Sequence, residues 1–298
     1  MKALIVGHGF ISSHLEERLK KEGEVMVISD KDVVNLENIE YLDIDYIFRL
    51  SAYGNHYYQN LYFFDKRRMI ETNVLNLLQL LEFTKNINYK AFINFSTSSV
   101  TLPVQTMYSA TKHAGEHICQ AFAQKYKKLI ISIRPYSLYG SREADFRFIP
   151  TIINNGLKGI RSKVVFESRH DWIFIEDFID ALMLITKKVE HCISYPLDPY
   201  CLGNNWNMEK PISIGTGLSW TNIEVVETIN QIFADNENKE LFYDKSISMR
   251  EYDTKDWVAD ISTLKKLGWQ PKHSLREGLT KVYAHLKQQF KKKDNRTL

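Results

Sequence analysis

The first fifteen residues constrain the fold of this chain more than any other segment. An apolar run over residues 1–6 leads directly into Gly7-His8-Gly9 and the start of a helix. Gly7 permits a tight turn, and Gly9 lets main-chain N–H groups approach a pyrophosphate at the positive end of that helix. Ser12 stands where a third glycine would allow close packing, and a serine adds little bulk there. The pattern predicts the strand, glycine turn and helix that begin a dinucleotide-binding fold.

Apolar strand-like runs alternate with helical patterns through the first half of the chain. Their tips fall near residues 6, 29, 50, 96 and 134, which favours a parallel sheet flanked by helices. The span 30–45 is short for a strand and a crossover helix, so we expect an abbreviated third unit there. We predict an α/β fold of the Rossmann type, a doubly wound parallel sheet with a smaller, interleaved C-terminal substrate lobe. The expected limits are 1–140 for the dinucleotide-binding domain and 141–298 for the lobe, with segments near 171–188 and 211–216 returning to the main domain.

Tyr108 and Lys112 carry the most specific chemical signal. The apolar spacing after Tyr108 predicts a helix over 108–126, which places these two side chains on one face at i and i+4. An ammonium about 4 Å from a phenolate interacts by about 4 kcal/mol at an effective dielectric near 20, or roughly three units on a tyrosine pKa near 10. Thr97, at a predicted strand end, is positioned to share the bond to a substrate oxygen. These three residues are the parts of a proton relay for hydride transfer.

The tip of the second predicted strand bears on cofactor choice. Ser29 stands where an acid that selects NAD would most often lie, Asp30 follows it, and Lys31 could accept the 2′-phosphate of NADP. Asp30 would repel that phosphate. The sequence therefore leans to NAD and leaves NADP open.

Together these motifs resemble the extended short-chain dehydrogenase/reductase family, specifically its NAD-dependent epimerase/dehydratase group, which acts on nucleotide sugars. The resemblance extends over almost the whole chain and includes Gly9-Phe10-Ile11-Ser12-Ser13-His14-Leu15, a phrase common in that group. It implies an NAD(P)-dependent enzyme. The cofactor-binding residues that it implies are Gly7, Gly9, Phe10, Ile11, Asp30, Leu50, Ser51, Ala52, Asn73, Tyr108, Lys112 and Pro135.

The resemblance also implies substrate contacts, with two departures from the family pattern. Ser137 replaces the asparagine of the family's R-x-x-N-x-Y-G motif, and His170 stands where an arginine belongs, with Arg169 displaced by one. Arg250 matches the arginine that binds the substrate diphosphate. The implied substrate-binding residues are Ser98, Ser137, Arg169 and Arg250.

The pair Ser98-Ser99 bears on the reaction. The 4,6-dehydratases of this family carry Asp-Glu there, and neutral hydroxyls cannot move the proton that elimination of water requires. We therefore expect oxidoreduction at a sugar carbon, C4, by an epimerase or a 4-ketoreductase. In both, Tyr108 exchanges the hydroxyl proton, Thr97 orients the oxygen, and Lys112 lowers the tyrosine pKa and holds the nicotinamide ribose.

Two other functions stay open. An NAD(P)H-dependent reductase of a non-nucleotide carbonyl compound would keep Tyr108 and Lys112 but would need no diphosphate clamp at Arg250. A non-catalytic dinucleotide-sensing protein would have no need of Thr97, Tyr108 and Lys112 together. The sequence contains no G-x-S-x-G motif, so a serine hydrolase is unsupported.

Composition limits the partners. Lys plus Arg total 39 against 36 for Asp plus Glu, a net charge of +3 that gives no reason to expect nucleic acid. No apolar run is long enough for a bilayer and no signal peptide is evident, so we expect a cytoplasmic protein without a membrane partner. Cys119, Cys192 and Cys201 lack paired spacing, so neither a metal site nor a disulfide is expected. Family resemblance implies a homodimer through the helices 68–85 and 108–126.

Overall fold

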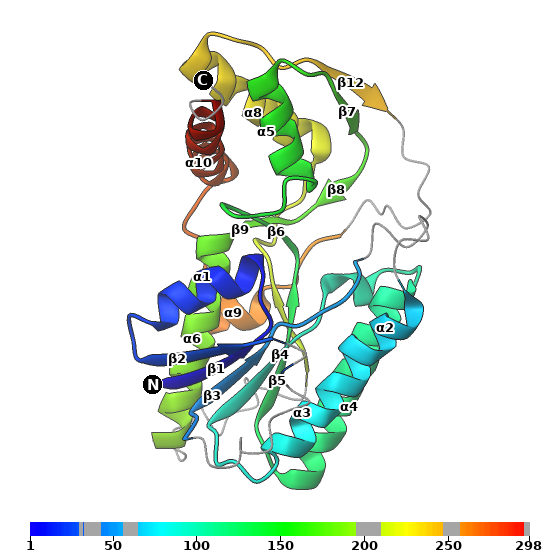
Figure 1. Ribbon diagram of the computed structural model, residues 1–298, viewed down its shortest axis with the longest axis vertical. Coiled ribbons are helices and arrows are strands. Elements are labelled where there is room, and N and C mark those ends of the chain that lie inside the picture. The colour runs from blue at the N-terminus through cyan, green and yellow to red at the C-terminus, as the bar shows by residue number, and fades with distance from the viewer. Residues whose placement is uncertain (30–31, 33–42, 56–64, 195–209, 247–256, 295–298) are drawn as a thin grey trace. The chain divides into compact units, whose positions relative to one another are not determined.

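The computed structural model describes residues 1–29, 32, 43–55, 65–194, 210–246 and 257–294 (Figure 1). The chain folds into two compact units, and each is built from three separate stretches of sequence. The first unit consists of Met1–Pro135, Ile179–Ile214 and Ser262–Trp269, and the second of Tyr136–Phe178, Gly215–Ile261 and Gln270–Leu298.

A sheet of six parallel strands forms the centre of the first unit, in the spatial order β2-β1-β3-β4-β5-β10. The inner strands are mostly apolar because both faces of a parallel sheet are covered. This sheet confirms the α/β, Rossmann-type fold. The strands are β1 (Lys2–Val6), β2 (Glu24–Ile28), β3 (Tyr46–Arg49), β4 (Ala91–Phe95), β5 (Ile130–Pro135) and β10 (Ile212–Ile214).

Helices cover both faces of this sheet. In Figure 1, α3 and α4 lie on one side, and α1 and α6 on the other. The core beneath α3 and α4 joins strand residues such as Leu4 and Phe92 to helix residues such as Leu80 and Phe122. The helical elements are α1 (Phe10–Leu19), α2 (Lys66–Ile70), the π turn η4 (Glu71–Leu75), α3 (Asn76–Thr84), the 3-10 turn η5 (Ser98–Thr101), α4 (Met107–Tyr126), α6 (Ile175–Ser194, continuous from the second unit) and α9 (Ser262–Lys266).

Helix α4 begins one residue before the predicted start and ends at the predicted residue. Its N-terminus is fixed by a capping box, in which the Ser109 N–H donates to Thr106 Oγ1 at 3.2 Å and the Thr106 N–H donates to Ser109 Oγ at 2.8 Å. The left-handed conformation of Lys127 (φ 55°) terminates it. Tyr108 therefore lies in the first turn of a well-capped helix.

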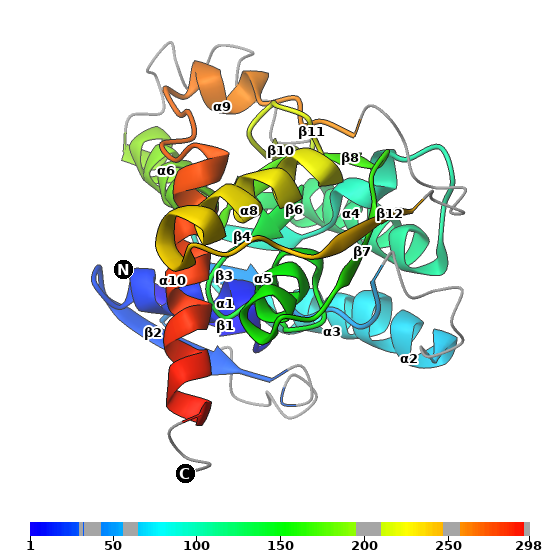
Figure 2. The ribbon, with the colours of Figure 1, turned by 90° about the horizontal axis from the view of Figure 1, so that it is seen from above.

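Among its described residues, three short strand pairs and three complete helices build the second unit. Helix α10 packs against α5 and α8 (Figure 2), where the rings of Phe233 and Tyr283 meet at 5.0 Å. The helices are α5 (Phe148–Lys158), α8 (Asn222–Glu237) and α10 (Leu275–Asp294). The pairs are β6 (Ser137–Tyr139) with β9 (Trp172–Phe174), β7 (Ser162–Val165) with β12 (Tyr243–Ser246), and β8 (Arg169–His170) with β11 (Trp220–Thr221).

Two buried carboxylates fix the loops of this second unit. Asp171 accepts hydrogen bonds from the Thr216 N–H at 2.6 Å, the Thr216 hydroxyl at 2.7 Å, the Gly217 N–H at 2.9 Å and the Ala259 N–H at 3.1 Å. Burial raises the pKa of Asp171, and these four donors oppose that rise. Asp177 accepts from the main chain and the ring of His273, at 3.1 and 2.8 Å. Asp171 and Asp177 therefore anchor loops.

One expectation about the cysteines is wrong. Cys192, near the end of α6, is bonded in a disulfide, whereas Cys119 is a buried thiol. Spacing could not reveal this pairing because a disulfide needs proximity in the fold. The abbreviated third unit expected over 30–45 falls mostly outside the described residues. Among those that are described, no helix has the length and apolar character needed to cross a membrane.

Candidate functional site

The glycine turn lies where the strand order changes direction, because β1 pairs with β2 on one side and β3 on the other. Gly7 has φ +112°, and a Cβ there would lie 2.7 Å from the main-chain nitrogen of Ser51. Ser51 follows β3 and donates its hydroxyl to the Val6 carbonyl at 3.1 Å. Only glycine satisfies this turn, which brings the predicted cofactor segment Leu50-Ser51-Ala52 against it.

Gly9 caps the N-terminus of α1 and faces open space. No atom lies within 4 Å of where its Cβ would be, and the first turn, which contains Phe10 and Ile11, holds no acidic residue. Ser12 Oγ accepts from the Gly9 N–H at 2.6 Å and donates to the Gly9 carbonyl at 3.0 Å. The serine that replaces the third glycine therefore stabilises the turn. The positive helix end is left open for an anion.

An acid that the sequence analysis missed lies beyond the tip of β2. Asp32 accepts hydrogen bonds from the Ser29 hydroxyl at 2.7 Å and the Ser29 N–H at 2.9 Å, and these bonds lower the pKa of Asp32. The S-x-x-D spacing, a local side-chain to main-chain pattern, could have indicated it. The predicted Asp30, with Lys31, lies outside the described residues.

Asn73 lies in the π turn η4 and is 1% exposed. Its side-chain oxygen accepts from the Tyr53 N–H at 2.9 Å, and its amide donates to the Tyr53 carbonyl and to Thr111 Oγ1, both at 3.0 Å. The Thr111 hydroxyl in turn donates to the Tyr108 carbonyl at 2.9 Å. The described contacts of the Asn73 side chain thus join the loop after β3 to helix α4.

Thr97, Tyr108 and Lys112 lie on two elements that pack together, η5 and α4. Thr97 caps η5, and its Oγ1 accepts from the Ser99 N–H at 3.2 Å and lies 3.1 Å from Ser99 Oγ. Lys112 is 3% exposed, one helical turn after the half-buried Tyr108. A Cβ on Gly54 would lie 3.5 Å from Tyr108 Cδ2, so the loop after β3 approaches the tyrosine ring. Ser98, beside Thr97, is buried.

An ion pair that the sequence analysis did not single out supports this helix. Arg134, at the end of β5, donates from Nε and Nη2 to the two carboxylate oxygens of Glu116 at 2.8 and 2.6 Å. Glu116 follows Lys112 by one turn of α4, so Tyr108, Lys112 and Glu116 lie along one face of the helix. The bidentate pair with Arg134 therefore holds that face. The predicted cofactor residue Pro135 follows Arg134 directly and pairs in register with Ile214. The position of Glu116, four residues after Lys112 on the same helix face, is the sequence feature that could have indicated its role.

The predicted substrate residues of the second unit form local contacts. The Ser137 N–H donates to the Asp171 carbonyl at 3.0 Å. Arg169 Nε donates to the Ser219 hydroxyl at 3.0 Å, and its neighbour His170 is buried against Trp172 and Trp257 at ring distances of 5.4 and 5.3 Å. Arg250 lies outside the described residues. A diphosphate clamp by these residues stays a prediction.

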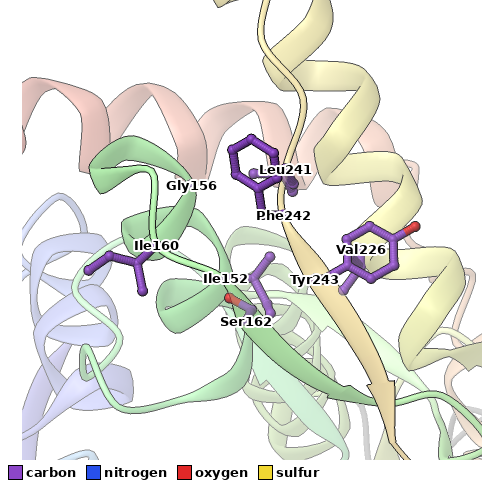
Figure 3. Close-up of a pocket in the computed structure, with 8 residues that line it drawn as sticks. All are labelled: Ile152, Gly156, Ile160, Ser162, Val226, Leu241, Phe242 and Tyr243. Atoms are coloured by element: carbon purple, nitrogen blue, oxygen red, sulfur yellow. The ribbon is translucent and has the colours of Figure 1, made fainter.

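The second unit also has a small apolar depression that has no room for a water molecule (Figure 3). No charged side chain lines it, so it lacks the donors that bind a diphosphate. Its lining residues are Ile152, Gly156, Ile160, Ser162, Val226, Leu241, Phe242 and Tyr243. Among the described residues, no group of three or more His, Cys, Asp or Glu could hold a metal ion.

Comparison with known proteins agrees with the geometry of the first unit. The family model "NAD dependent epimerase/dehydratase family" matches residues 3–195, which include the glycine turn, Thr97, Tyr108 and Lys112. The chain belongs to this family. The protein is therefore an NAD-dependent enzyme, and the expected family and cofactor class are confirmed.

Curated relatives match most of the chain. A CDP-abequose synthase of Salmonella typhimurium is 23% identical over 93% of this chain and 95% of its own. An uncharacterized UDP-glucose epimerase of Bacillus subtilis is 25% identical over 96% of this chain and 98% of its own. Among solved structures, the UDP-glucose 4-epimerase of Thermotoga maritima covers 97% of this chain and 100% of its own, with a TM-score of 0.78 and 22% identity. That similarity confirms the fold.

The residues present fit a dinucleotide. A side chain larger than hydrogen at Gly9 would enter the open space over the N-terminus of α1, and the fixed turn at Gly7 holds Ser51 beside it. Main-chain N–H groups of the Phe10 turn would hold the pyrophosphate. Lys112, buried one turn after Tyr108, would hold the nicotinamide ribose.

Proposed function

We propose that this enzyme carries out NAD(P)-dependent oxidoreduction at a sugar carbon, C4, of a nucleotide sugar, as an epimerase or a 4-ketoreductase. The observation that carries the proposal is the arrangement on α4, where Tyr108 and the buried Lys112 lie one turn apart beside the Thr97 turn. The relatives support the substrate class, since they include a CDP-abequose synthase and a UDP-glucose epimerase. The UDP-glucuronic acid 4-epimerase of Bacillus cereus, a structure of TM-score 0.77 in complex with UDP-glucuronic acid and NAD, has the same fold.

The side chains of the first unit supply proton transfer. The Lys112 ammonium favours the phenolate of Tyr108, because an opposite charge nearby stabilises the charged form of an acid. Tyr108 then exchanges a proton with the sugar hydroxyl, and Thr97 shares the hydrogen bond to that oxygen and fixes its direction. A bound nicotinamide would supply the acceptor or donor of the hydride.

The residues after Thr97 argue against dehydration as the reaction. Ser98 and Ser99 are both buried, and neither hydroxyl is an acid or base near neutral pH. Dehydration has to be considered because relatives of this chain include dTDP-glucose 4,6-dehydratases. That of Haemophilus influenzae, for example, is 25% identical over 70% of this chain. We propose a reaction without elimination of water.

The remaining site assignments are part of this proposal. Ser98, Ser137, Arg169 and Arg250 are proposed to contact the substrate, with Arg250 on its diphosphate. A homodimer through α2–α3 and α4 is supported by the exposed apolar side chains Ile70, Leu75 and Leu78, which are 42, 54 and 40% exposed. Sedimentation equilibrium tests the dimer, and a monomer at micromolar concentration would contradict it.

Two measurements test the function. Mass spectrometry of the nucleotides released when the purified protein is denatured identifies a retained cofactor or ligand. Incubation with 4-keto and 4-hydroxy nucleotide sugars then separates the reactions, because a reductase consumes NAD(P)H stoichiometrically and an epimerase does not. Activity on a carbonyl compound that lacks a nucleotide, with none on any nucleotide sugar, would refute the proposed substrate class.

A further inference from the structure

Arg49 is a buried charge for which the proton relay described above has no use. It lies on β3 in the middle of the sheet, is 1% exposed, and is among the largest fully buried side chains of the described residues. A guanidinium withdrawn from water is costly unless it is hydrogen-bonded and its charge interacts favourably. Its neighbours show what it does.

The Arg49 guanidinium donates a hydrogen bond to the main-chain carbonyl of Thr72. Thr72 belongs to the π turn η4 and directly precedes Asn73, whose side chain binds the Tyr53 main chain and Thr111. Thr111 donates to the Tyr108 carbonyl. A continuous series of hydrogen bonds and one peptide link therefore leads from Arg49 to Tyr108.

The charge of Arg49 acts in the same buried layer as that of Lys112. Burial raises the pKa of the Cys119 thiol on α4 to about 12, while the positive charges of Arg49 and Lys112 oppose that rise and Glu116 adds to it. All three charged side chains are therefore close to one thiol. The Glu116 carboxylate is in turn bound by Arg134. The charges that act on this thiol are thus two cations, Arg49 and Lys112, and one carboxylate, which Arg134 pairs.

We propose that Arg49 is a positioning residue of the proton relay, which braces the turn behind Tyr108 and adds a second buried positive charge beside Lys112 that favours the tyrosinate. Only the effect of Arg49 on turnover rests on the proposed function; its effect on the titration of Tyr108 does not. Other charged groups on the elements that pack against α4 are Lys66, Arg67 and Arg68 of α2 and Glu71 of η4, and Arg68 stacks on the Tyr53 ring at 4.4 Å. All four are solvent-exposed, so water screens their charges more than that of Arg49.

The test measures the titration of Tyr108 directly. The full chain, labelled with ¹³Cζ-tyrosine and saturated with NAD⁺, is titrated by NMR, and the Tyr108 resonance is assigned by its absence from Tyr108→Phe. Arg49→Gln removes the charge and keeps a donor for the Thr72 carbonyl, whereas Arg49→Lys keeps the charge. Lys125→Gln, which removes an exposed cation from the same helix, is the control.

We expect Arg49→Gln to raise the Tyr108 titration midpoint by about one pH unit, and Arg49→Lys and Lys125→Gln to leave it nearly unchanged. The affinity for NAD⁺ should stay within about twofold in Arg49→Gln. An unchanged midpoint in that variant, or equal rises in Arg49→Gln and Arg49→Lys, would overturn the proposal.

A second variant keeps the proposal testable if Arg49→Gln does not fold. Glu116→Gln removes the carboxylate of the same layer, so it should shift the midpoint in the opposite direction, downward by about one pH unit. A rise or no change would contradict a buried positive field at Tyr108. Because NMR reads the phenol without turnover, failure of this inference is distinguishable from failure of the proposed reaction, which shows as a fully active Tyr108→Phe enzyme.

Discussion

Arg134 donates two parallel hydrogen bonds to the carboxylate of Glu116, at 2.8 and 2.6 Å, and so joins the end of β5 to the helix that carries Tyr108 and Lys112. The Glu116 side chain is 6% exposed and that of Arg134 is 20% exposed. This pair fixes the rotation of α4 against the sheet.

Arg134→Met should destabilise the protein by about 2–4 kcal/mol, because it leaves the Glu116 carboxylate buried without its partner. The double variant Arg134→Met/Glu116→Leu should recover part of that loss. Urea unfolding at pH 7 measures both. Lys85→Met, which breaks an exposed pair with Glu82, is the matched control and should cost less than about 1 kcal/mol. Equal effects of the two single variants would show that the buried pair has no special role.

The two glycines of the first turn should respond differently to alanine. Gly9→Ala meets open space and an extended backbone, so stability should stay within about 0.5 kcal/mol while NAD affinity falls about tenfold or more, because the methyl group occupies the anion site. Gly7→Ala forces a Cβ against the Ser51 main chain at φ +112° and should destabilise the fold. Calorimetric titration with NAD⁺, together with urea unfolding, separates the two. Unaltered NAD binding by Gly9→Ala would argue against a cofactor at this turn.

Asp32 provides a test of cofactor choice. Its hydrogen bonds from Ser29 lower its pKa, so the carboxylate stays charged at neutral pH beyond the tip of β2. Asp32→Asn should weaken the preference for NADH over NADPH by about tenfold, since it removes a charge that repels the 2′-phosphate. Dissociation constants for both cofactors measure this ratio. Asp43→Asn, at an exposed acid paired with Lys2, serves as the control. The same ratio of dissociation constants in both variants would exclude Asp32 as the residue that selects NADH over NADPH.

Glu143 predicts a pH dependence of stability in the second unit. Burial raises the pKa of Glu143 from 4.5 to about 7, although Arg147 opposes the rise. The folded state therefore binds a proton more tightly than the unfolded state does. The stability that Glu143 contributes is full below pH 4.5 and is lost as the pH rises through 7, by at most about 3 kcal/mol.

Glu143→Gln removes this titration, so its stability relative to the parent should improve between about pH 4.5 and pH 7 and then level off. Urea midpoints at pH 5 and pH 8 measure the difference. A constant offset between the two proteins across this range would contradict the raised pKa.

The sequence was sufficient for features that depend on local pattern. The parallel sheet, the turn at Gly7 and the helix of Tyr108 all follow from periodicity and from residues with particular backbone requirements. What it missed depends on contacts between distant segments. Arg134 and Glu116 meet only because β5 packs beside α4, and Cys192 forms a disulfide that spacing did not indicate.

Asn73 illustrates a second limit. A motif placed this residue at the site, but its side-chain contacts, with Tyr53 and Thr111, could not be read from the chain because they join a π turn, a loop and a helix. Nothing in the sequence indicated that Arg49 is buried, since a charged residue at the end of an apolar run is typical of the exposed end of a strand. Its burial depends on a distant segment, the turn η4, whose Thr72 carbonyl accepts its hydrogen bond.

The most direct test of this mechanism is Tyr108→Phe, measured with the nucleotide sugar on which the parent enzyme acts. Turnover should fall by about a thousandfold or more, while NAD⁺ binds with an affinity within about threefold of the parent, because the phenol moves the proton and the glycine turn holds the cofactor. Turnover comparable to that of the parent would contradict the assignment of Tyr108 as the residue that exchanges the substrate proton.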